Sequence, residues 1–192
     1  MLNTSKDTSN SYIDSNNTTD NTNKNEVVES YNYKINYKKN NLDNIIEGTY
    51  YNGISIFTYN NSKYYYDSTN TYLIFDNYYT KASLEYDITK IFYIKEFLNN
   101  LIIQSTTTYL DNSKQITYLA STNDLMKYLF NDSNNYTTTN EIIVKENNDN
   151  IEKITIDLNN LNLELKVIEI EYSNINNITD LKFNMEDYTY KE

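Results

Sequence analysis

Residues 31–39 read YNYKINYKK, and this stretch gives the clearest indication of the fold. Its odd-numbered positions from Tyr31 to Tyr37 are aromatic or aliphatic, and the positions between them are Asn or Lys. Successive side chains of a β-strand point to opposite faces of a sheet, so this alternation predicts a strand with one buried face and one wet face. Such strands are typical of antiparallel sheets that pack a core on one side.

Similar short runs follow along the chain, separated by turn residues. Asn52-Gly53 stands between two of them and is a strong hairpin signal. In the run that ends at Tyr172, the apolar phase slips by one residue at Val167-Ile168, which predicts either a β-bulge or a strand buried on both faces. Further strands are predicted at residues 42–51, 54–59, 64–67, 72–75, 101–110, 114–120, 141–146, 151–158 and 163–172.

Two segments have helical periodicity instead. Residues 87–101 place several Ile and Phe side chains near one helical stripe, with Asp87 as the N-cap. Residues 123–131 follow Ser121 and Thr122, either of which can cap a helix. The helices fall between antiparallel strands and form no repeated βαβ units. This order predicts an α+β fold in which a curved antiparallel sheet carries the helices on one face.

The composition predicts how the chain is divided. Residues 1–25 are almost entirely Asn, Thr, Ser, Asp and Lys, and we expect them to form a disordered polar tail. Residues 26–192 are predicted to form a single domain, since the chain of 192 residues has the length of one domain. The chain has 22 Tyr but no His, Cys, Trp or Pro, and its 16 basic residues are all Lys, a bias that indicates an AT-rich genome.

These absences limit the available chemistry. Without His or Cys there is no Ser-His or Cys-His nucleophile and no usual zinc, haem or iron–sulfur site. The net charge of −11 disfavours nucleic acid as a partner, and 2 Gly cannot form a glycine-rich phosphate loop. No apolar run has the length of a transmembrane segment, and the residues after Met1 lack the basic and apolar regions of a signal peptide.

Two groups of oxygen-bearing side chains are candidate sites. Glu169 and Glu171 share one face of the last long strand, as a pair that cleaves glycosidic bonds would, but carboxylates on the wet face of a strand are ordinary. The loop at 132–135 has donors for calcium but lacks the Gly and the distal Glu of an EF-hand. We therefore expect no catalytic residue, no metal site and no cofactor, and we expect the protein not to be an enzyme.

Two longer stretches resemble a known family. YNGISIFTYNNSKYYYDSTNTYLIFDNYY (51–79) resembles the central strands of the LolA/LppX-like lipoproteins. IEKITIDLNNL (151–161) and LELKVIEIEYSNINNITDLKF (163–183) resemble the C-terminal end of small Firmicutes-type members. The resemblance implies a half-barrel, a strongly curved antiparallel sheet with two main helices packed on its concave face. It also implies a turn at Tyr172-Ser173-Asn174, from which Leu181–Phe183 pairs back on the sheet edge.

The resemblance also implies a function and a location. Members are extracytoplasmic, cell-surface lipoproteins of bacteria, although this sequence shows neither a signal peptide nor a lipidated Cys. Several members bind lipid between sheet and helices, so an apolar ligand such as a lipid is expected to occupy a cavity there. The residues expected to line it are Tyr37, Ile54, Ile56, Tyr72 and Ile74. The alternative is a structural or protein-interaction domain with a filled core and no ligand.

Overall fold

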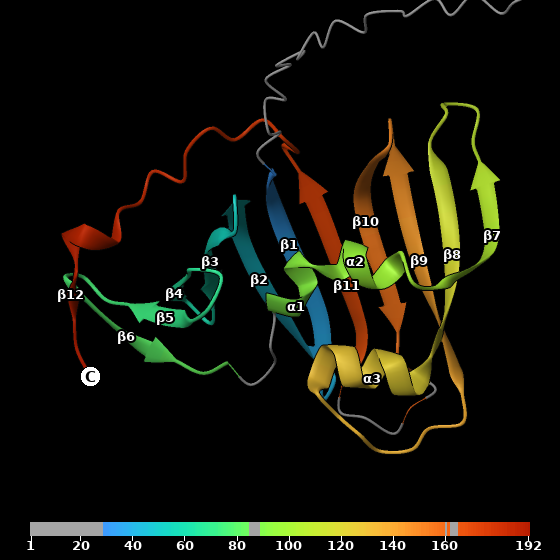
Figure 1. The fold of residues 1–192 in the computed structure, drawn as a ribbon, viewed down its shortest axis with the longest axis horizontal. Helices are drawn as coiled ribbons and strands as arrows, with labels where there is room; N and C mark the ends of the chain where they lie inside the picture. Colours follow the sequence, from blue (N-terminus) through green and yellow to red (C-terminus); the bar gives the residue numbers. More distant parts are fainter. Residues whose placement is uncertain (1–28, 85–88, 160, 162–164) are drawn as a thin grey trace, which may run out of the picture.

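The computed structural model describes residues 29–84, 89–159, 161 and 165–192, which form one large open sheet with short helices on one face (Figure 1). The sheet has 12 strands in the spatial order β12-β6-β5-β4-β3-β2-β1-β11-β10-β9-β8-β7. The strands are β1 (Ser30–Lys39), β2 (Leu42–Tyr51), β3 (Ile54–Tyr59), β4 (Ser62–Tyr66), β5 (Thr71–Ile74), β6 (Tyr78–Ala82), β7 (Ile102–Thr108), β8 (Lys114–Ser121), β9 (Thr139–Asn147), β10 (Asn150–Asp157), β11 (Leu165–Ser173) and β12 (Thr189–Tyr190). The helices are α1 (Thr89–Phe92), α2 (Ile94–Leu98) and α3 (Thr122–Phe130), and a 3-10 turn lies at Met185–Asp187.

Two antiparallel meanders build this sheet. The first runs from β1 to β6 and the second from β7 to β11, and β1 pairs with β11 to join them. Neighbouring strands are antiparallel except β12 and β6, which are parallel. Each meander therefore has one strand in the middle of the sheet and one strand near an outer edge.

The predicted fold class, a half-barrel with two main helices on its concave face, is wrong. The sheet is mixed and open, and the helices of the described chain are small: α1 has 4 residues, α2 has 5 and α3 has 9. The helix predicted over 87–101 is interrupted at Tyr93, whose backbone has φ −108° and ψ 14°. Ile and Phe have only modest helix propensity, and a stripe of them does not distinguish one long helix from two short ones. The predicted cap, Asp87, lies outside the described residues.

Other predicted elements had mixed outcomes. α3 begins as predicted at the N-cap Ser121, whose hydroxyl accepts the backbone N–H of Asp124 at 3.1 Å. β6 is missing from the predicted strands, because YYTKA shows no alternation of apolar and polar residues. The strand predicted at Leu181–Phe183 is wrong, since the terminal strand is β12 and it pairs with β6. The tail predicted at 1–25 lies outside the described residues.

The predicted β-bulge near Val167-Ile168 is confirmed. In the ladder between β1 and β11, Tyr37 pairs with Ile168 and Lys39 with Leu165, so β11 carries one extra residue between these pairs. An extra residue restores the inward direction of the side chains that follow it. Leu165 and Ile168 are both buried as a result, although they are three positions apart.

Asparagine forms most of the tight hairpin turns. At Asn52-Gly53, between β2 and β3, the φ angles are 47° and 85°, which confirms the predicted hairpin. A two-residue hairpin turn of this type needs positive φ at both central positions, and Asn and Gly tolerate it best. The same conformation recurs at Asn40-Asn41, Asn60-Asn61 and Asn148-Asp149. The abundance of Asn therefore has a structural use, whatever its genomic origin.

The core lies between the sheet and the helices. Directly paired residues share a face of a sheet, and one helix-side row of them crosses both meanders. Every member of the row is at most 9% exposed. The members are Ile46, Ile35, Ile170, Ile154, Val144 and Ile116. Buried residues of the helices that belong to the same core are Ile91, Phe92, Ile94, Leu98, Leu125, Met126 and Leu129.

Gly48 makes room for the ring of Tyr33 inside this core. A Cβ atom on Gly48 would lie 2.6 Å from the hydroxyl oxygen of Tyr33 and 2.5 Å from the carbonyl oxygen of Ile56. The Tyr33 hydroxyl donates to Ser55 Oγ at 2.8 Å, and Ser55 Oγ donates to the Thr49 carbonyl at 3.0 Å. The buried hydroxyls are thereby satisfied, as polar groups in a core must be.

Candidate functional site

The edge formed by β6 is closed by the chain itself. β12 lies along it, with the Thr189 N–H donating to the Asn77 carbonyl at 3.1 Å and the Lys191 N–H donating to the Tyr79 carbonyl at 2.8 Å. Lys191 Nζ also lies 3.8 Å from the centre of the Tyr78 ring. The C-terminal segment therefore supplies both backbone partners and side-chain cover at this edge. Figure 1 shows its strand β12 beside β6.

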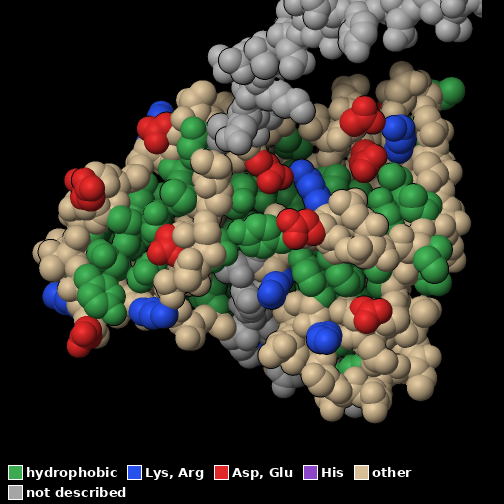
Figure 2. Space-filling model, in the orientation of Figure 1, with side chains coloured by type: hydrophobic (Ala, Val, Ile, Leu, Met, Phe, Trp, Pro, Cys, Tyr) green, Lys and Arg blue, Asp and Glu red, His purple; other side chains and the backbone are tan. Residues whose placement is uncertain are grey.

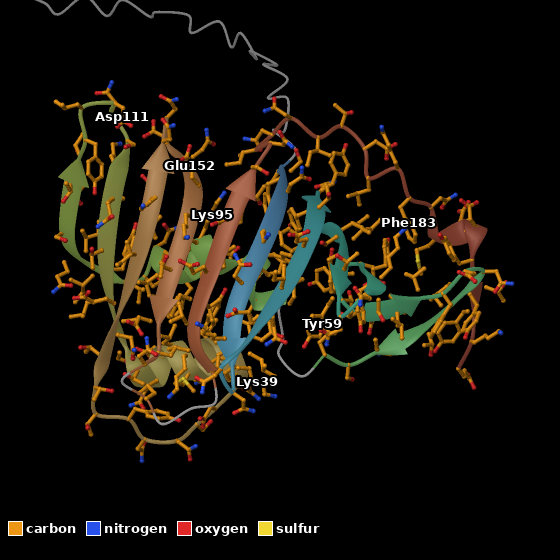
Figure 3. The ribbon with its side chains drawn as sticks, turned by 180° about the vertical axis from the view of Figure 1, so that it is seen from behind. Lys39, Tyr59, Lys95, Asp111, Glu152 and Phe183 are labelled. Atoms are coloured by element: carbon orange, nitrogen blue, oxygen red, sulfur yellow. The ribbon has the colours of Figure 1, made fainter. Side chains whose placement is uncertain are left out.

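Aromatic side chains hold the same segment on the sheet face opposite the helices. Phe183 lies 5.5 Å from Tyr65, and Tyr190 lies 5.3 Å from Tyr79, measured between ring centroids. Tyr72 bridges the two contacts, 6.3 Å from Tyr65 and 5.4 Å from Tyr79. Figure 3 shows Phe183 at this end of the molecule, far from the hairpin at Asp111.

The opposite edge, formed by β7, has a different construction. All seven residues of β7 are exposed, and Ile102 and Ile103 keep 73% and 55% of their surface in water. Beyond the strand, Tyr109 is exposed and Leu110 is fully exposed. In the described part of the chain β8 is the only strand that pairs with β7. We call residues 101–110, LIIQSTTTYL, the open edge.

A rigid turn holds the end of the open edge. The Tyr109 N–H donates to the Ser113 carbonyl at 2.9 Å, and Asn112 adopts φ 65°. Asp111 Oδ1 accepts the Ser113 N–H at 3.0 Å and the Ser113 hydroxyl at 2.6 Å. These hydrogen bonds lower the pKa of the Asp111 carboxyl below its ordinary value, because they stabilise the charged form. The edge is thus a preformed strand.

The ladder with β8 determines which backbone groups face outward. In antiparallel pairs, residues whose N–H and C=O point to the neighbouring strand alternate with residues whose groups point away. Tyr109 donates to Ser113, and Thr107 pairs with Gln115 two positions further in the same register. The N–H and C=O groups of Thr106 and Thr108 therefore point away from β8, toward the free side of the edge.

The open edge has few of the features that usually protect an edge strand. Charged residues, especially Lys, and Pro commonly block edge-to-edge pairing, and the ten residues of LIIQSTTTYL include none of them. A bulge at Gln104, where the register with β8 shifts between Ile103 and Ser105, is the protective feature that is present. The nearest ion pair, Lys114 with Asp149 at 3.1 Å, lies on β8 and the neighbouring turn.

At this edge the buried rows of the helix-side core end in exposed residues. The row of Ile154, Val144 and Ile116 continues to Thr106, and a parallel row through Ile142 and Tyr118 continues to Ile103. Thr106 and Ile103 are exposed, although their paired neighbours on β8 are not. Figure 2 shows hydrophobic side chains reaching the right-hand margin of the molecule on this face. A further strand paired with β7 would cover the side chains of Thr106 and Ile103.

The structure does not bring the five expected cavity-lining residues into one wall. Tyr37 lies on the helix side, buried, and its hydroxyl donates to the Tyr59 hydroxyl at 2.9 Å. The other four lie on the opposite face of the sheet, as their pairing partners show. Tyr72 belongs to the aromatic cluster under the C-terminal segment, and Ile74 pairs with Tyr79 beside it. Ile54 and Ile56 lie on the same face, on β3.

Three open depressions are lined by described residues. One lies between α2 and α3, where Phe97 stacks on Tyr128 with centroids 4.4 Å apart, and Lys127 and Asp124 are among the residues that line it. A second lies at the tip of the β7–β8 hairpin, beside Asp111. The third is a polar depression on the wet face of the central strands, lined in part by the ion pair of Lys34 and Glu47.

Several carboxylates of the described chain take part in ion pairs and turns. Lys153 Nζ lies 2.9 Å from Glu169 and 3.2 Å from Glu171, so these two carboxylates hold a lysine on the wet face. Their presence raises the pKa of Lys153, chiefly through the hydrogen bond to Glu169. Asp132 accepts the Asn134 N–H at 2.8 Å and the Tyr136 hydroxyl at 2.8 Å. The described residues contain no cluster of three or more potential metal ligands.

No protein-family model and no curated protein matches this chain. The resemblance to the LolA/LppX-like family therefore stays a prediction that these comparisons neither support nor contradict. Within the described residues, no helix is both long and apolar enough to cross a membrane.

The sequence pattern alone did not single out the open edge. The strand at 101–110 was predicted, but strand order cannot be derived from alternation, so its position at the end of the sheet was unknown. One partial signal was available: LIIQSTTTYL contains no charged residue, although the predicted strands at 54–59 and 72–75 contain none either. Uncharged edge strands are the ones that accept another strand.

Proposed function

We propose that this protein is a non-enzymatic interaction domain that binds an extended strand of a protein partner along β7. The observation that carries the proposal is the open edge itself, a preformed and fully exposed strand without charged residues. Adding a strand to an exposed sheet edge is a common way for proteins to recognise extended segments. Main-chain hydrogen bonds provide affinity in that mode, and side chains at alternate positions provide specificity.

The partner strand would be recognised in a defined way. Its backbone would pair with the outward N–H and C=O groups of Thr106 and Thr108. On the helix side its side chains would cover Ile103, which is 55% exposed at the end of a core row. Burial of that surface would contribute about 25 cal/mol per Å² of apolar area. A segment rich in β-branched and apolar residues fits this edge best.

Affinity capture with matched variants tests this proposal. The wild-type chain, Thr106→Lys and Thr58→Lys are used as baits in an extract of the source cells. Thr58 is an exposed strand Thr of β3, which is paired on both sides, so Thr58→Lys adds the same charge away from an edge. We expect a protein retained by the wild type and by Thr58→Lys but lost with Thr106→Lys, because a lysine on an edge opposes strand addition.

The captured protein must then be shown to occupy the edge. Hydrogen exchange on the purified pair is expected to slow at the backbone amides of residues 105–109, compared with the free chain. Equal capture by all three baits, or protection elsewhere with none at 105–109, would remove the proposal.

A second candidate function is the binding of an apolar ligand. The observation that favours it is the depression between α2 and α3, which is lined by Phe97, Leu101 and Tyr128. The test is native mass spectrometry of the chain purified without detergent, before and after incubation with mixed lipids. A stoichiometric bound lipid that is lost with Phe97→Asp would support this function, and an unchanged protein mass would remove it.

A further inference from the structure

We propose that the strand that pairs with β7 is β7 of a second copy of this chain, antiparallel about a two-fold axis at Thr106. This inference rests on the proposed function, because it names the occupant of the same edge. A two-fold interface is isologous, so the same surface of each copy must complement itself. The sequence and geometry of the open edge meet that requirement.

The pattern of the open edge is self-complementary. LIIQSTTTYL is apolar at both ends and consists of Gln, Ser and Thr between them, so a reversed copy sets Ile102 against Tyr109 and the central Ser and Thr residues against one another. Pairs of apolar or Thr residues directly opposite each other stabilise an antiparallel ladder. The resulting pairs are Thr106 with Thr106, Ser105 with Thr107, Ile103 with Thr108 and Ile102 with Tyr109.

The bulge at Gln104 determines which residues of the two copies meet. Thr106 pairs with Ile116 and Ile103 pairs with Tyr118, so both lie on the helix side although they are three positions apart. Directly opposed residues must share a face of the sheet. Because of the extra residue, Ile103 on the helix side meets Thr108, which is also on that side. Without the bulge, Ile103 would lie on the face opposite the helices and would meet Tyr109 there.

The backbone is also arranged for pairing about Thr106. The N–H and C=O of Thr106 point away from β8, as the register through Tyr109 and Ser113 requires. Two copies related by a two-fold axis at this residue can exchange both hydrogen bonds between their Thr106 residues. Thr108 then provides the next outward pair on each side. A centre at Thr107 would instead oppose two residues whose groups already point toward β8.

Charge favours this site over the rest of the surface for self-association. Each copy carries a net charge of −11, which opposes the approach of two copies. The open edge contributes none of this charge, so pairing there buries no ionised group. The remaining repulsion is long-range and is screened within about 10 Å at 0.1 M salt. A dimer through this edge should therefore strengthen as salt is added.

A charge-swap experiment on the full chain tests the inference. Sedimentation velocity is run on the wild type, Thr106→Lys, Thr106→Glu, and an equal mixture of the two variants, over a range of protein concentrations. Two seven-residue strands form a small interface, so the wild type is expected to dimerise with a dissociation constant on the order of micromolar. Each variant alone sets two like charges directly opposite and should weaken the dimer by about tenfold or more.

The mixture gives the decisive result. Opposite charges face each other only between unlike copies, so the mixture should regain the dimer that each variant loses. A monomeric wild type, variants that dimerise unchanged, or a mixture that stays monomeric would each overturn the inference. Thr58→Lys is the control and should dimerise like the wild type. If the wild type is monomeric but captures another protein at residues 105–109, self-pairing fails and the proposed function stands. If it does neither, both fail.

Discussion

The two edges of the sheet end in opposite ways. At the β6 edge the chain returns, adds the two-residue strand β12 and sets Phe183 and Tyr190 on the aromatic rings beside it. At the β7 edge the described chain adds nothing, and Ile102 stays 73% exposed. A free edge with such surface is a liability unless something covers it. Within the described residues, the chain therefore closes one edge itself and adds no strand to the other.

The largest expected effect lies midway between the edges, at Gly48. Gly48→Ala places a Cβ 2.5 Å from the Ile56 carbonyl oxygen and 2.6 Å from Phe57 Cβ, and neither backbone nor core can easily give way. We expect a loss of about 3 kcal/mol in the free energy of unfolding, measured by urea denaturation. Gly48 lies on β2, which is paired on both sides, so the loss at this position sets the scale for the edge variants. Thr58→Ala is the control in the same sheet, and an equal loss there would contradict this account.

The second effect is a loss of stability in alkali from the central tyrosines. Burial raises the pKa of Tyr33 well above the ordinary value of 10.0, and burial, together with Tyr93 and Glu29, raises the pKa of Tyr50 to about 12. Burial likewise raises the pKa of Tyr31 and Tyr172.

The sign of this effect follows from linkage. A raised pKa means that the folded state holds the phenol proton more tightly than the unfolded state does. The stabilisation is complete below pH 10 and is lost as the pH rises from about 10 toward 12. Thermal unfolding followed by circular dichroism should therefore show a falling midpoint across this window, with tyrosinate absorbance rising in step. A midpoint that stays constant to pH 12 would show that these phenols are not buried as described.

The third effect separates the two edges directly. Phe183→Ala at the closed edge removes the contacts with Tyr65 and Tyr188 and the cation–π contact with Lys63, whose Nζ lies 4.6 Å from the ring centre. We expect a loss of about 1 to 2 kcal/mol in the free energy of unfolding. The matched change at the open edge is Tyr109→Ala, which should cost about 0.5 kcal/mol or less because that ring is exposed. Equal losses would mean that the edges do not differ in cover.

Hydrogen exchange would sharpen this result. Phe183→Ala should speed the exchange of amides in β5 and β6 and leave those in β8 and β9 unchanged, since local opening follows local packing.

The sequence predicted the parts of this fold that depend on neighbouring residues. The alternation in 31–39, the Asn52-Gly53 turn and the Ser121 cap each reflect a local preference, and each is confirmed. The large open sheet was not predicted, because strand order depends on contacts between distant residues. The pairing of β1 with β11 joins residues more than 120 positions apart and has no local signal.

The candidate site was harder to predict for a related reason. Alternation shows that Tyr37 and Ile54 each belong to the apolar face of their own strand. It does not show that these two faces lie on opposite sides of the assembled sheet, as they do in β1 and β3. Assigning faces needs the register of every intervening strand, and a shift of one residue reverses the assignment. The open edge required strand order as well. The absence of charge from β7 can be read from the sequence, but its exposure at the end of the sheet cannot.

The smallest expected effect is the sharpest test of the comparison. Thr106→Lys should change the free energy of unfolding of the monomer by about 0.5 kcal/mol or less, because Thr106 is exposed and its outward backbone groups make no bond within the described sheet. The measurement is urea denaturation at a protein concentration well below that at which the dimer forms. A closed edge would respond differently, since a buried lysine loses hydration. A loss above 1 kcal/mol would therefore mean that part of this chain already covers β7. A small loss combined with the loss of dimer would show that this edge contributes to association and hardly to folding.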